Sequence, residues 1–303
     1  MSTAAPLEGR TTVSLGTATP GGGFPVYGQA VADTINETDP SLEVRTQNTK
    51  GSTENVPLLE AGRLDIALVQ GEVAHEAWSG IGRAPASLPI LAAMYSTPGM
   101  FVVRGDSAYR SIQDLVGKPV AFGARGSGLI ILARYVLDGL GLDRDRDFQA
   151  VFLDAAGEGP RMVLDGRVAA LWGGGGWPGF VAVASAPAGA RFLVPDADGI
   201  AQIQRAHPFL KMMMVPANSY PGQPADIVSV GSWSFILTRP SLPDDVAYRL
   251  ARALHRGEAA LGARLPQARE TTAANTVGAV PRTELIHAGA LRYLREIGLI
   301  RTP

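Results

Sequence analysis

The chain has 303 residues, which predicts two domains of ordinary size. Its 27 Lys and Arg residues nearly balance its 28 Asp and Glu residues, so the formal net charge of −1 excludes a strong overall attraction to nucleic acid or to an anionic membrane. Apolar residues make up 46% and charged residues 18%, a balance that supports a sizeable core and argues against wholesale disorder.

The sequence shows no signature of a metal site or of a membrane-spanning segment. It has no cysteine, which excludes disulfides, thiolate metal sites and a cysteine nucleophile. The four histidines have no metal-binding spacing, so we expect no metal site. The first ten residues lack the apolar stretch of a signal peptide, and no apolar run reaches the roughly 18 residues of a spanning helix.

Strand-like segments alternate with helical ones along the first third of the chain. Residues 64–70 form a nearly continuous apolar run, typical of a strand buried on both faces of a parallel sheet. Tyr27, Val31 and Ile35 recur at every fourth position, which predicts a helix that begins near Pro25. The predicted strands here are 12–16, 42–47, 64–70, 88–95 and 100–104, and a second helix is predicted from Ser52 to near Gly62.

The same pattern then starts again. A strand at 118–123 leads through a glycine loop into a helix at 129–140. Further strands are predicted at 149–153, 168–172, 192–194, 212–215 and 233–238. The tail from Asp244 onward is predicted to be mostly helical, with one helix starting at 242–245 and another at 282–285.

This alternation predicts an α/β protein with parallel sheets, and the second start predicts two lobes of one architecture. We place residues 1–103 and 235–303 in one lobe and 104–234 in the other, with hinges near 102–104 and 233–235. Ligands of such sheets bind where the carboxyl ends of strands meet the starts of helices. The candidate site is therefore a cleft between the lobes.

Three loops at predicted strand-to-helix junctions combine glycine with hydroxyl residues: 16–27, 49–55 and 123–128. Free N–H groups at a helix start attract carboxylate or phosphate, and glycine lets the backbone approach closely. Two such loops from one lobe and one from the other would clamp a small anion. Arg125 lies inside the third loop and would pair with a carboxylate, or it is simply exposed. The alternative for all three loops is ordinary turns and caps.

None of the remaining motifs indicates catalysis. The segment 174–179 matches G-x-G-x-x-G, but Pro178 lies inside it and it does not open a first βαβ unit, so we expect no dinucleotide cofactor. Trp172 ends a predicted strand and either walls a ligand pocket or belongs to the core. The sequence contains no G-x-S-x-G motif, P-loop or metal-binding motif. We therefore expect neither an enzyme nor a bound cofactor.

At these loops the sequence resembles the TAXI solute-binding proteins, which serve one class of tripartite ATP-independent periplasmic (TRAP) transporters. The matching stretches occur in family order and cover roughly residues 12 to 300. They are LGTATPGGGFPVY (15–27), GSTEN (51–55), LDIALVQ (64–70), IQDLVGKPVAFG (112–123), GSG (126–128), YPGQ (220–223) and LPDDVAY (242–248).

The resemblance implies a type II periplasmic-binding-protein fold, whose two lobes close on a ligand. It implies a non-catalytic periplasmic receptor that delivers a small carboxylate, such as a glutamate-like amino acid or a dicarboxylate, to TRAP permease subunits. A monomer that binds no nucleic acid is expected. By matching position, the cleft would be lined by Thr17, Tyr27, Ser52, Thr53, Asn55, Gln70, Ser127 and Gly128.

The sequence also departs from the family pattern. Arg125 stands where the family often has a small residue or proline, Leu129 replaces a frequent threonine, and 172–177 is rich in glycine and tryptophan. An added arginine would favour a second carboxylate, and two tryptophans an aromatic or larger acid. The alternative functions on the same fold are a ligand-binding component of a membrane signalling receptor and an enzyme.

Overall fold

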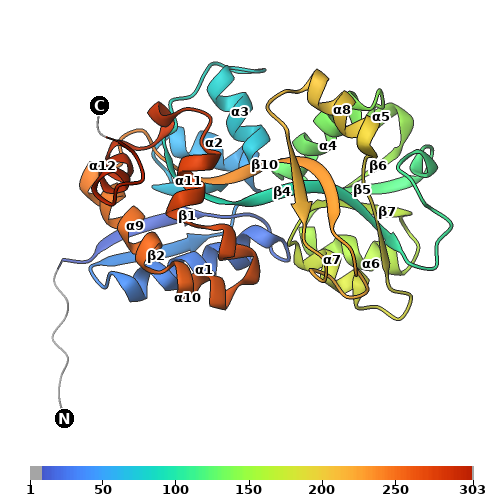
Figure 1. Cartoon of the computed structure of the whole chain (residues 1–303), viewed down its shortest axis with the longest axis horizontal. Coiled ribbons are helices and arrows are strands. Elements are labelled where there is room, and N and C mark those ends of the chain that lie inside the picture. The colour runs from blue at the N-terminus through green and yellow to red at the C-terminus, as the bar shows by residue number, and fades with distance from the viewer. Residues whose placement is uncertain (1–8, 302–303) are drawn as a thin grey trace, which may run out of the picture.

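Two lobes lie side by side in the computed structural model, which describes residues 9–301 (Figure 1). Each lobe has strands covered by helices. Two long strands run from one lobe into the other, β4 (Ile90–Arg104) and β10 (Ile227–Thr238). The predicted two-lobed α/β fold is confirmed. The two extended segments predicted at 88–95 and 100–104 are one strand.

The first lobe begins with a parallel sheet. β1 (Thr11–Gly16) pairs in parallel with β2 (Leu42–Gln47) and with β3 (Ile66–Val69). All four residues of β3 are buried, as expected from its apolar run. The helices that follow these strands are α1 (Gly23–Thr38), α2 (Ser52–Glu60) and α3 (Gly71–Ser79).

The second lobe repeats this arrangement. β5 (Pro119–Ala124) pairs in parallel with β6 (Gln149–Leu153) and β7 (Ala170–Gly174). β8 (Ala190–Leu193) pairs with β4, and β9 (Lys211–Val215) pairs with β10, both antiparallel. The helices are α4 (Gly128–Gly139), α5 (Arg144–Asp147), α6 (Gly159–Leu164), α7 (Pro178–Ala184) and α8 (Ala197–Ala206).

The chain then returns to the first lobe through α9 (Asp244–Arg256), α10 (Glu258–Arg264), the 3-10 turn η3 (Pro266–Glu270), α11 (Ala273–Ala279) and α12 (Ala288–Glu296). The prediction of a helix that starts at 282–285 is wrong. That segment holds only a 3-10 turn, because Ile286 next forms a β-bridge with Ile90. The helix starts after His287, whose Nδ1 accepts a hydrogen bond from the Gly289 N–H at 3.1 Å.

The two crossing strands join the sheets. The hydrogen-bonded order is β2-β1-β3-β10-β4-β7-β5-β6. β10 reaches β3 through residues 235–238, and β4 reaches β7 through residues 99–102. The register between β4 and β10 slips between Trp233 and Phe235. Such an irregularity bends a strand, and here it lies where the sheet passes from one lobe to the other.

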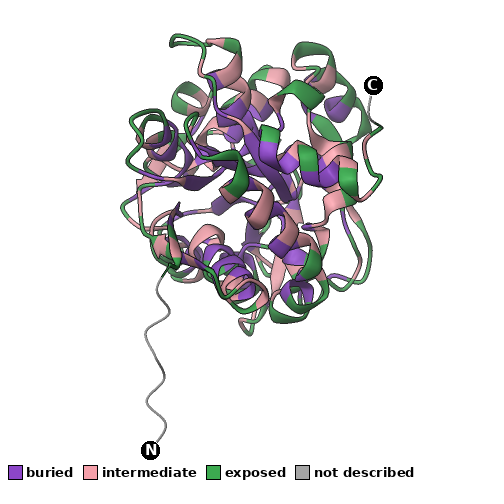
Figure 2. Ribbon diagram, turned by 90° about the vertical axis from the view of Figure 1, so that its left-hand side faces the viewer, coloured by how far each residue is buried: buried purple, intermediate pink, exposed green. Residues whose placement is uncertain are grey.

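Hydrophobic clusters cover both faces of both sheets. In the first lobe, one face packs against α1, α9 and α12 and the other against α2 and α3. In the second lobe, α4 and α8 cover one face and α6 and α7 the other. Figure 2 shows buried strands at the centre and exposed residues on the outer helices and loops. Each lobe therefore has its own core.

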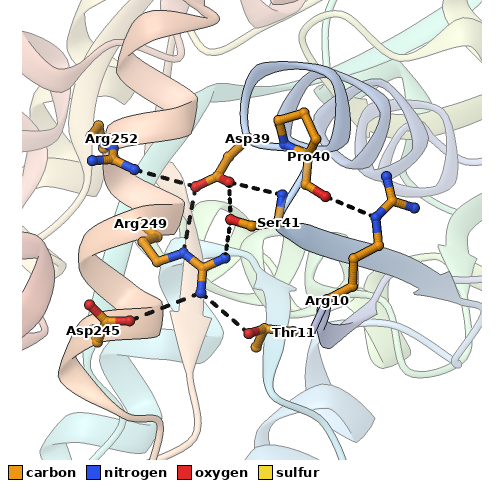
Figure 3. A network of polar contacts seen from close by, with 8 residues as sticks. All are labelled: Arg10, Thr11, Asp39, Pro40, Ser41, Asp245, Arg249 and Arg252. Carbon is orange, nitrogen blue, oxygen red and sulfur yellow. Dashed lines mark hydrogen bonds and ion pairs between the residues drawn. The ribbon is translucent and has the colours of Figure 1, made fainter. Parts of the chain in front are cut away.

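A polar network links α9 to the start of β1 and to the turn between α1 and β2 (Figure 3). Asp39, which ends α1, accepts hydrogen bonds from the Ser41 N–H at 3.1 Å and from Arg252 at 3.5 Å, and it pairs with Arg249 Nε at 3.5 Å. Burial alone would raise the pKa of Asp39, but the hydrogen bonds from Ser41 and the charge of Arg249 outweigh it and lower that pKa. Arg249 also donates to the Thr11 hydroxyl at 3.3 Å.

Replacing Asp39 should therefore destabilise the protein. We expect Asp39→Asn to lower the free energy of unfolding by about 1–3 kcal/mol, because it removes a charged acceptor and leaves Arg249 poorly paired. Asp245→Asn is the matched control, because Asp245 belongs to the same network but its side chain is 76% exposed and lies 4.0 Å from Arg249. Its effect should stay below about 0.5 kcal/mol. Equal losses in urea denaturation would contradict this account.

A buried carboxyl lies beside the crossing strands. Glu72, in the first turn of α3, is 0% exposed, and neither carboxylate oxygen has a hydrogen-bond partner of good geometry within residues 9–301. Burial raises its pKa to about 7, an effect that the nearby Ser232 hydroxyl and Gln70 amide only partly offset. Close packing maintains this burial, since a Cβ on Gly71 would lie 2.2 Å from Ser232 Oγ.

Glu72 should make stability fall as pH rises. Its folded-state pKa of about 7 lies above the value of about 4.3 expected in the unfolded chain, so stability is lost between these two pH values and the loss is complete above pH 7. The free energy of unfolding of Glu72→Gln should therefore rise relative to that of the native protein by roughly 2–3 kcal/mol between pH 5 and pH 8. Urea denaturation at both pH values measures this gain. Glu284→Gln, at an exposed site, should show no such change, and a pH-independent difference for Glu72→Gln would refute the assignment.

Candidate functional site

A cavity of about 670 Å³, partly open to solvent, lies between the two lobes. The starts of α1, α2 and α4 border it, as does β4 where that strand crosses between the lobes. The first lobe and β4 contribute Ala18, Thr19, Gly22, Gly23, Phe24, Lys50, Gly51, Ser52, Gln70, Tyr95, Thr97 and Gln267. The second lobe contributes Gly123, Ala124, Ser127, Gly128, Leu129, Ala156, Gly174, Gly175 and Trp177.

Four predicted site residues meet at one end of this cavity: Ser52, Gln70, Ser127 and Gly128. The Ser52 hydroxyl accepts a hydrogen bond from the Gln70 N–H at 3.0 Å, and the Ser127 hydroxyl caps α4 by accepting from the Leu129 N–H at 3.2 Å. A Cβ on Gly128 would lie 2.6 Å from Gln70 Cβ and 3.0 Å from Ser52 Oγ. Glycine at 128 therefore lets the second lobe come close to the first.

The lobes also bond directly across the cavity. Thr53 donates to the Gly126 carbonyl from its N–H at 3.1 Å and from its hydroxyl at 2.9 Å. Gln267 Nε2 donates to the Gly175 carbonyl at 2.9 Å. These hydrogen bonds hold the two lobes together on either side of the cavity. They place Thr53, predicted as a lining residue, beside the cavity as a bridge between the lobes.

Three other predicted residues lie beneath the loops and outside the lining. The Thr17 hydroxyl donates to the Gln47 carbonyl at 3.1 Å, and Asn55 Nδ2 donates to the Thr17 carbonyl at 2.8 Å. The Tyr27 hydroxyl bonds with the Thr271 hydroxyl at 2.9 Å. Thr17, Tyr27 and Asn55 are each 0% exposed. They hold the loops in shape, and direct ligand contact by any of them stays a prediction.

Arg125 and Trp172 also lie outside the lining. The Arg125 side chain is exposed, and its guanidinium lies over the Phe152 ring, 5.4 Å from the centroid. Trp172 is 0% exposed, and its Nε1 donates to the Leu129 carbonyl at 2.8 Å. Trp172 thus takes the core role left open by the sequence, because β7 points its ring into the second-lobe cluster.

Sequence reasoning missed Tyr95, Thr97 and Gln267. Tyr95 and Thr97 lie on β4, so no local motif marks them, and only the crossing of that strand behind the cavity brings them there. Burial, together with the neighbouring Tyr27 and Glu270, raises the pKa of Tyr95 well above its usual value, so its hydroxyl stays protonated. Gln267 arrives on η3 from the C-terminal part of the chain.

Three helix starts at the cavity offer free donors. Within residues 9–301, the N–H groups of Ser52, Gly128 and Phe24 make no hydrogen bond, and each belongs to the first turn of a helix. The positive ends of α1, α2 and α4 therefore border the cavity. Lys50 adds one cation. This arrangement suits a bound anion.

Residues 9–301 contain no group of three or more His, Asp or Glu side chains arranged to hold a metal ion. In the same residues, every helix falls short of the length and apolar character needed to cross a membrane.

The fold is shared with several solved structures at low sequence identity. A Bordetella bronchiseptica RB50 protein matches with a TM-score of 0.58 at 12% identity, covering 95% of this chain and 98% of that one. The periplasmic aliphatic sulphonate binding protein of Escherichia coli matches with a TM-score of 0.51 at 17% identity, covering 96% and 94%. A TctC solute binding protein from Polaromonas matches with a TM-score of 0.50 at 16% identity, covering 88% and 90%.

These likenesses confirm the two-lobed fold of periplasmic binding proteins. The profile of one sequence family, described as NMT1-like, matches residues 15–298 and so covers nearly the whole chain, including all three glycine loops. The chain belongs to the NMT1-like family.

Proposed function

We propose that this protein is a non-catalytic, extracytoplasmic receptor that captures a small organic anion between its lobes. One observation carries the proposal: the cavity between the lobes is bordered by the N-terminal ends of α1, α2 and α4, whose first turns keep unbonded N–H groups within the described residues. Free N–H groups and the positive helix ends stabilise a carboxylate, sulfonate or phosphate. The aliphatic sulphonate for which the Escherichia coli protein is named is an organic anion of this kind.

The partner in this proposal is a membrane permease of the TRAP class, to which the receptor delivers its ligand in the periplasm. Support comes from the ordered TAXI-like stretches, two of which form helix starts at the site. GSTEN (51–55) forms the start of α2, and GSG (126–128) leads into α4. The receptor is proposed to act as a monomer, with no cofactor.

Capture would proceed by closure of the two lobes, which the sequence predicts to be residues 1–103 with 235–303 and residues 104–234. Because Val102 pairs with β7 and β8 inside the second-lobe sheet, we propose that the first hinge lies earlier in β4, at 93–96, and that residues 97–103 move with the second lobe. Its partner is the register slip at 233–235 of β10. The interlobe bonds of Thr53 and Gln267 then form only when the cleft is shut.

A thermal-shift screen tests the receptor proposal. The panel holds glutamate, glutamine, C4–C6 dicarboxylates, keto, hydroxy and aromatic acids, alkanesulfonates and neutral sugars. A ligand at about 100 times its dissociation constant stabilises the folded chain by roughly 2.7 kcal/mol, which raises the melting temperature by a few degrees. We expect shifts from organic anions and none from sugars. A shift from sugars alone, or turnover of a bound acid, would refute the proposal.

Closure predicts a penalty for a side chain at position 128. Gly128→Ala should weaken the acid with the largest shift by at least about tenfold, because its Cβ would overlap Gln70 when the lobes meet. Gly278→Ala is the control, since a Cβ there meets nothing within 4 Å. Titration calorimetry measures both affinities. If Gly128→Ala binds as tightly as Gly278→Ala, closure at this contact is not part of binding.

A further inference from the structure

The two ends of the cavity differ in chemistry. Lys50, Ser52 and Gln70 lie together at the α2–α4 end. A Cβ on Gly126 would lie 2.9 Å from Lys50 Cβ, and a Cβ on Gly128 would lie 3.0 Å from Ser52 Oγ. Gln70 is only 3% exposed, and its Nε2 makes no hydrogen bond of good geometry within residues 9–301, although the amide lies near the buried carboxyl of Glu72 and its Oε1 lies 2.9 Å from the Cβ position of Gly128. A buried amide donor left unbonded costs free energy unless a ligand accepts from it.

Lys50 is the cation of this end. Its side chain is exposed, and within the described part of the chain it forms no ion pair with a carboxylate. With the N–H groups at the starts of α2 and α4, it supplies charge and donors to one acid group. The α2–α4 end is therefore the place for an anionic head.

The α1–α7 end is apolar. Phe24, Leu129 and Trp177 line it, and Trp177 is only 5% exposed. Pro178, which follows Trp177, lies 4.0 Å from the Cβ position of Gly23, and the protonated Tyr95 hydroxyl lies 3.8 Å from that position. The aromatic rings at this end offer a surface to an apolar body.

The described lining of the cavity contains no carboxylate. The acids close to the lining are engaged or enclosed: Glu54 accepts from the Lys50 N–H at 2.6 Å, Glu270 accepts from the Ser96 N–H at 2.5 Å and from its hydroxyl at 3.0 Å, and Glu72 is fully buried. An ammonium group in the cavity would meet Lys50 and three positive helix ends without a counter-charge. Burying such a group unpaired is costly.

We propose that the cavity selects an organic acid with an apolar body and no ammonium group. This inference rests on the proposed function and narrows it, because α-amino acids such as glutamate then fall outside the preferred ligands. The acid head binds at Lys50, Ser52 and Gln70, and the body lies against Phe24, Leu129 and Trp177.

Two matched ligand pairs test the inference by titration calorimetry on the full chain. 3-Phenylpropanoate and phenylalanine differ by one ammonium group, as do glutarate and glutamate. We expect 3-phenylpropanoate to bind most tightly. The ammonium group should weaken binding by at least about tenfold in each pair. Glutarate should bind more weakly than 3-phenylpropanoate, because its second carboxylate replaces the apolar body.

Each contrary result has a distinct meaning. Phenylalanine or glutamate binding as tightly as its ammonium-free partner overturns the selection against ammonium but supports the receptor. Glutarate binding as tightly as 3-phenylpropanoate overturns the apolar body. If none of the four acids binds, the inference fails, and if the wider thermal-shift panel is also silent, the proposed function fails with it.

Substitutions test which residues bind the acid head of the ligand and which bind its apolar body. Lys50→Gln should weaken 3-phenylpropanoate by about three- to tenfold, whereas Lys118→Gln, also exposed but outside the cavity, should leave affinity unchanged. Trp177→Leu should weaken 3-phenylpropanoate more than glutarate. Phe24→Ala repeats that test at a partly buried position, in case the Trp177 variant does not fold. Equal effects of the two lysine variants would overturn the assignment of the head.

Discussion

The antiparallel pairing of β4 with β10 is the constraint on which the rest of the molecule depends. Both strands run from one lobe into the other, and β4 pairs with strands of both sheets, so the position of one lobe against the other is set by their register. Their pairing slips at the point where the sheet changes lobe, and the cavity lies directly beside this point, with Tyr95 and Thr97 of β4 in its wall. The candidate site and the proposed hinge therefore share the same strand, β4.

Much of the fold follows from local patterns in the sequence. The apolar run ending at Val69, the four-residue spacing of Tyr27, Val31 and Ile35, and the second start near Pro119 correspond to β3, α1 and β5. What local patterns miss is the first half of β10, which is rich in serine and glycine and gains its strand geometry from β9 and β4 on either side. Tertiary pairing decides such a segment.

Only part of the candidate site could likewise be predicted from local patterns in the sequence. Ser52, Gln70, Ser127 and Gly128 could be predicted because a glycine loop before a helix has a local sequence signature. The roles of the two tryptophans could not, because Trp172 and Trp177 share one glycine-rich segment. Both rings are buried, and which of them also borders the cavity depends on the pleat of β7 and on the start of α7, where Trp177 is the cap residue. Gln267 has no signature, since only the return of the C-terminal segment brings it to the cavity.

That return also bears on how the chain folds as it is synthesised. The second-lobe helices and sheet, from β5 to β9, come from one unbroken stretch, whereas β3 of the first lobe needs β10 as its neighbour and α1 needs α9. The first lobe therefore cannot complete its core until the last helices have left the ribosome. A nascent chain would carry an unfinished N-terminal half with exposed apolar strands, beside a second lobe that is already able to fold. Such a delay leaves the N-terminal half open to chaperones until α9 and α12 have been synthesised.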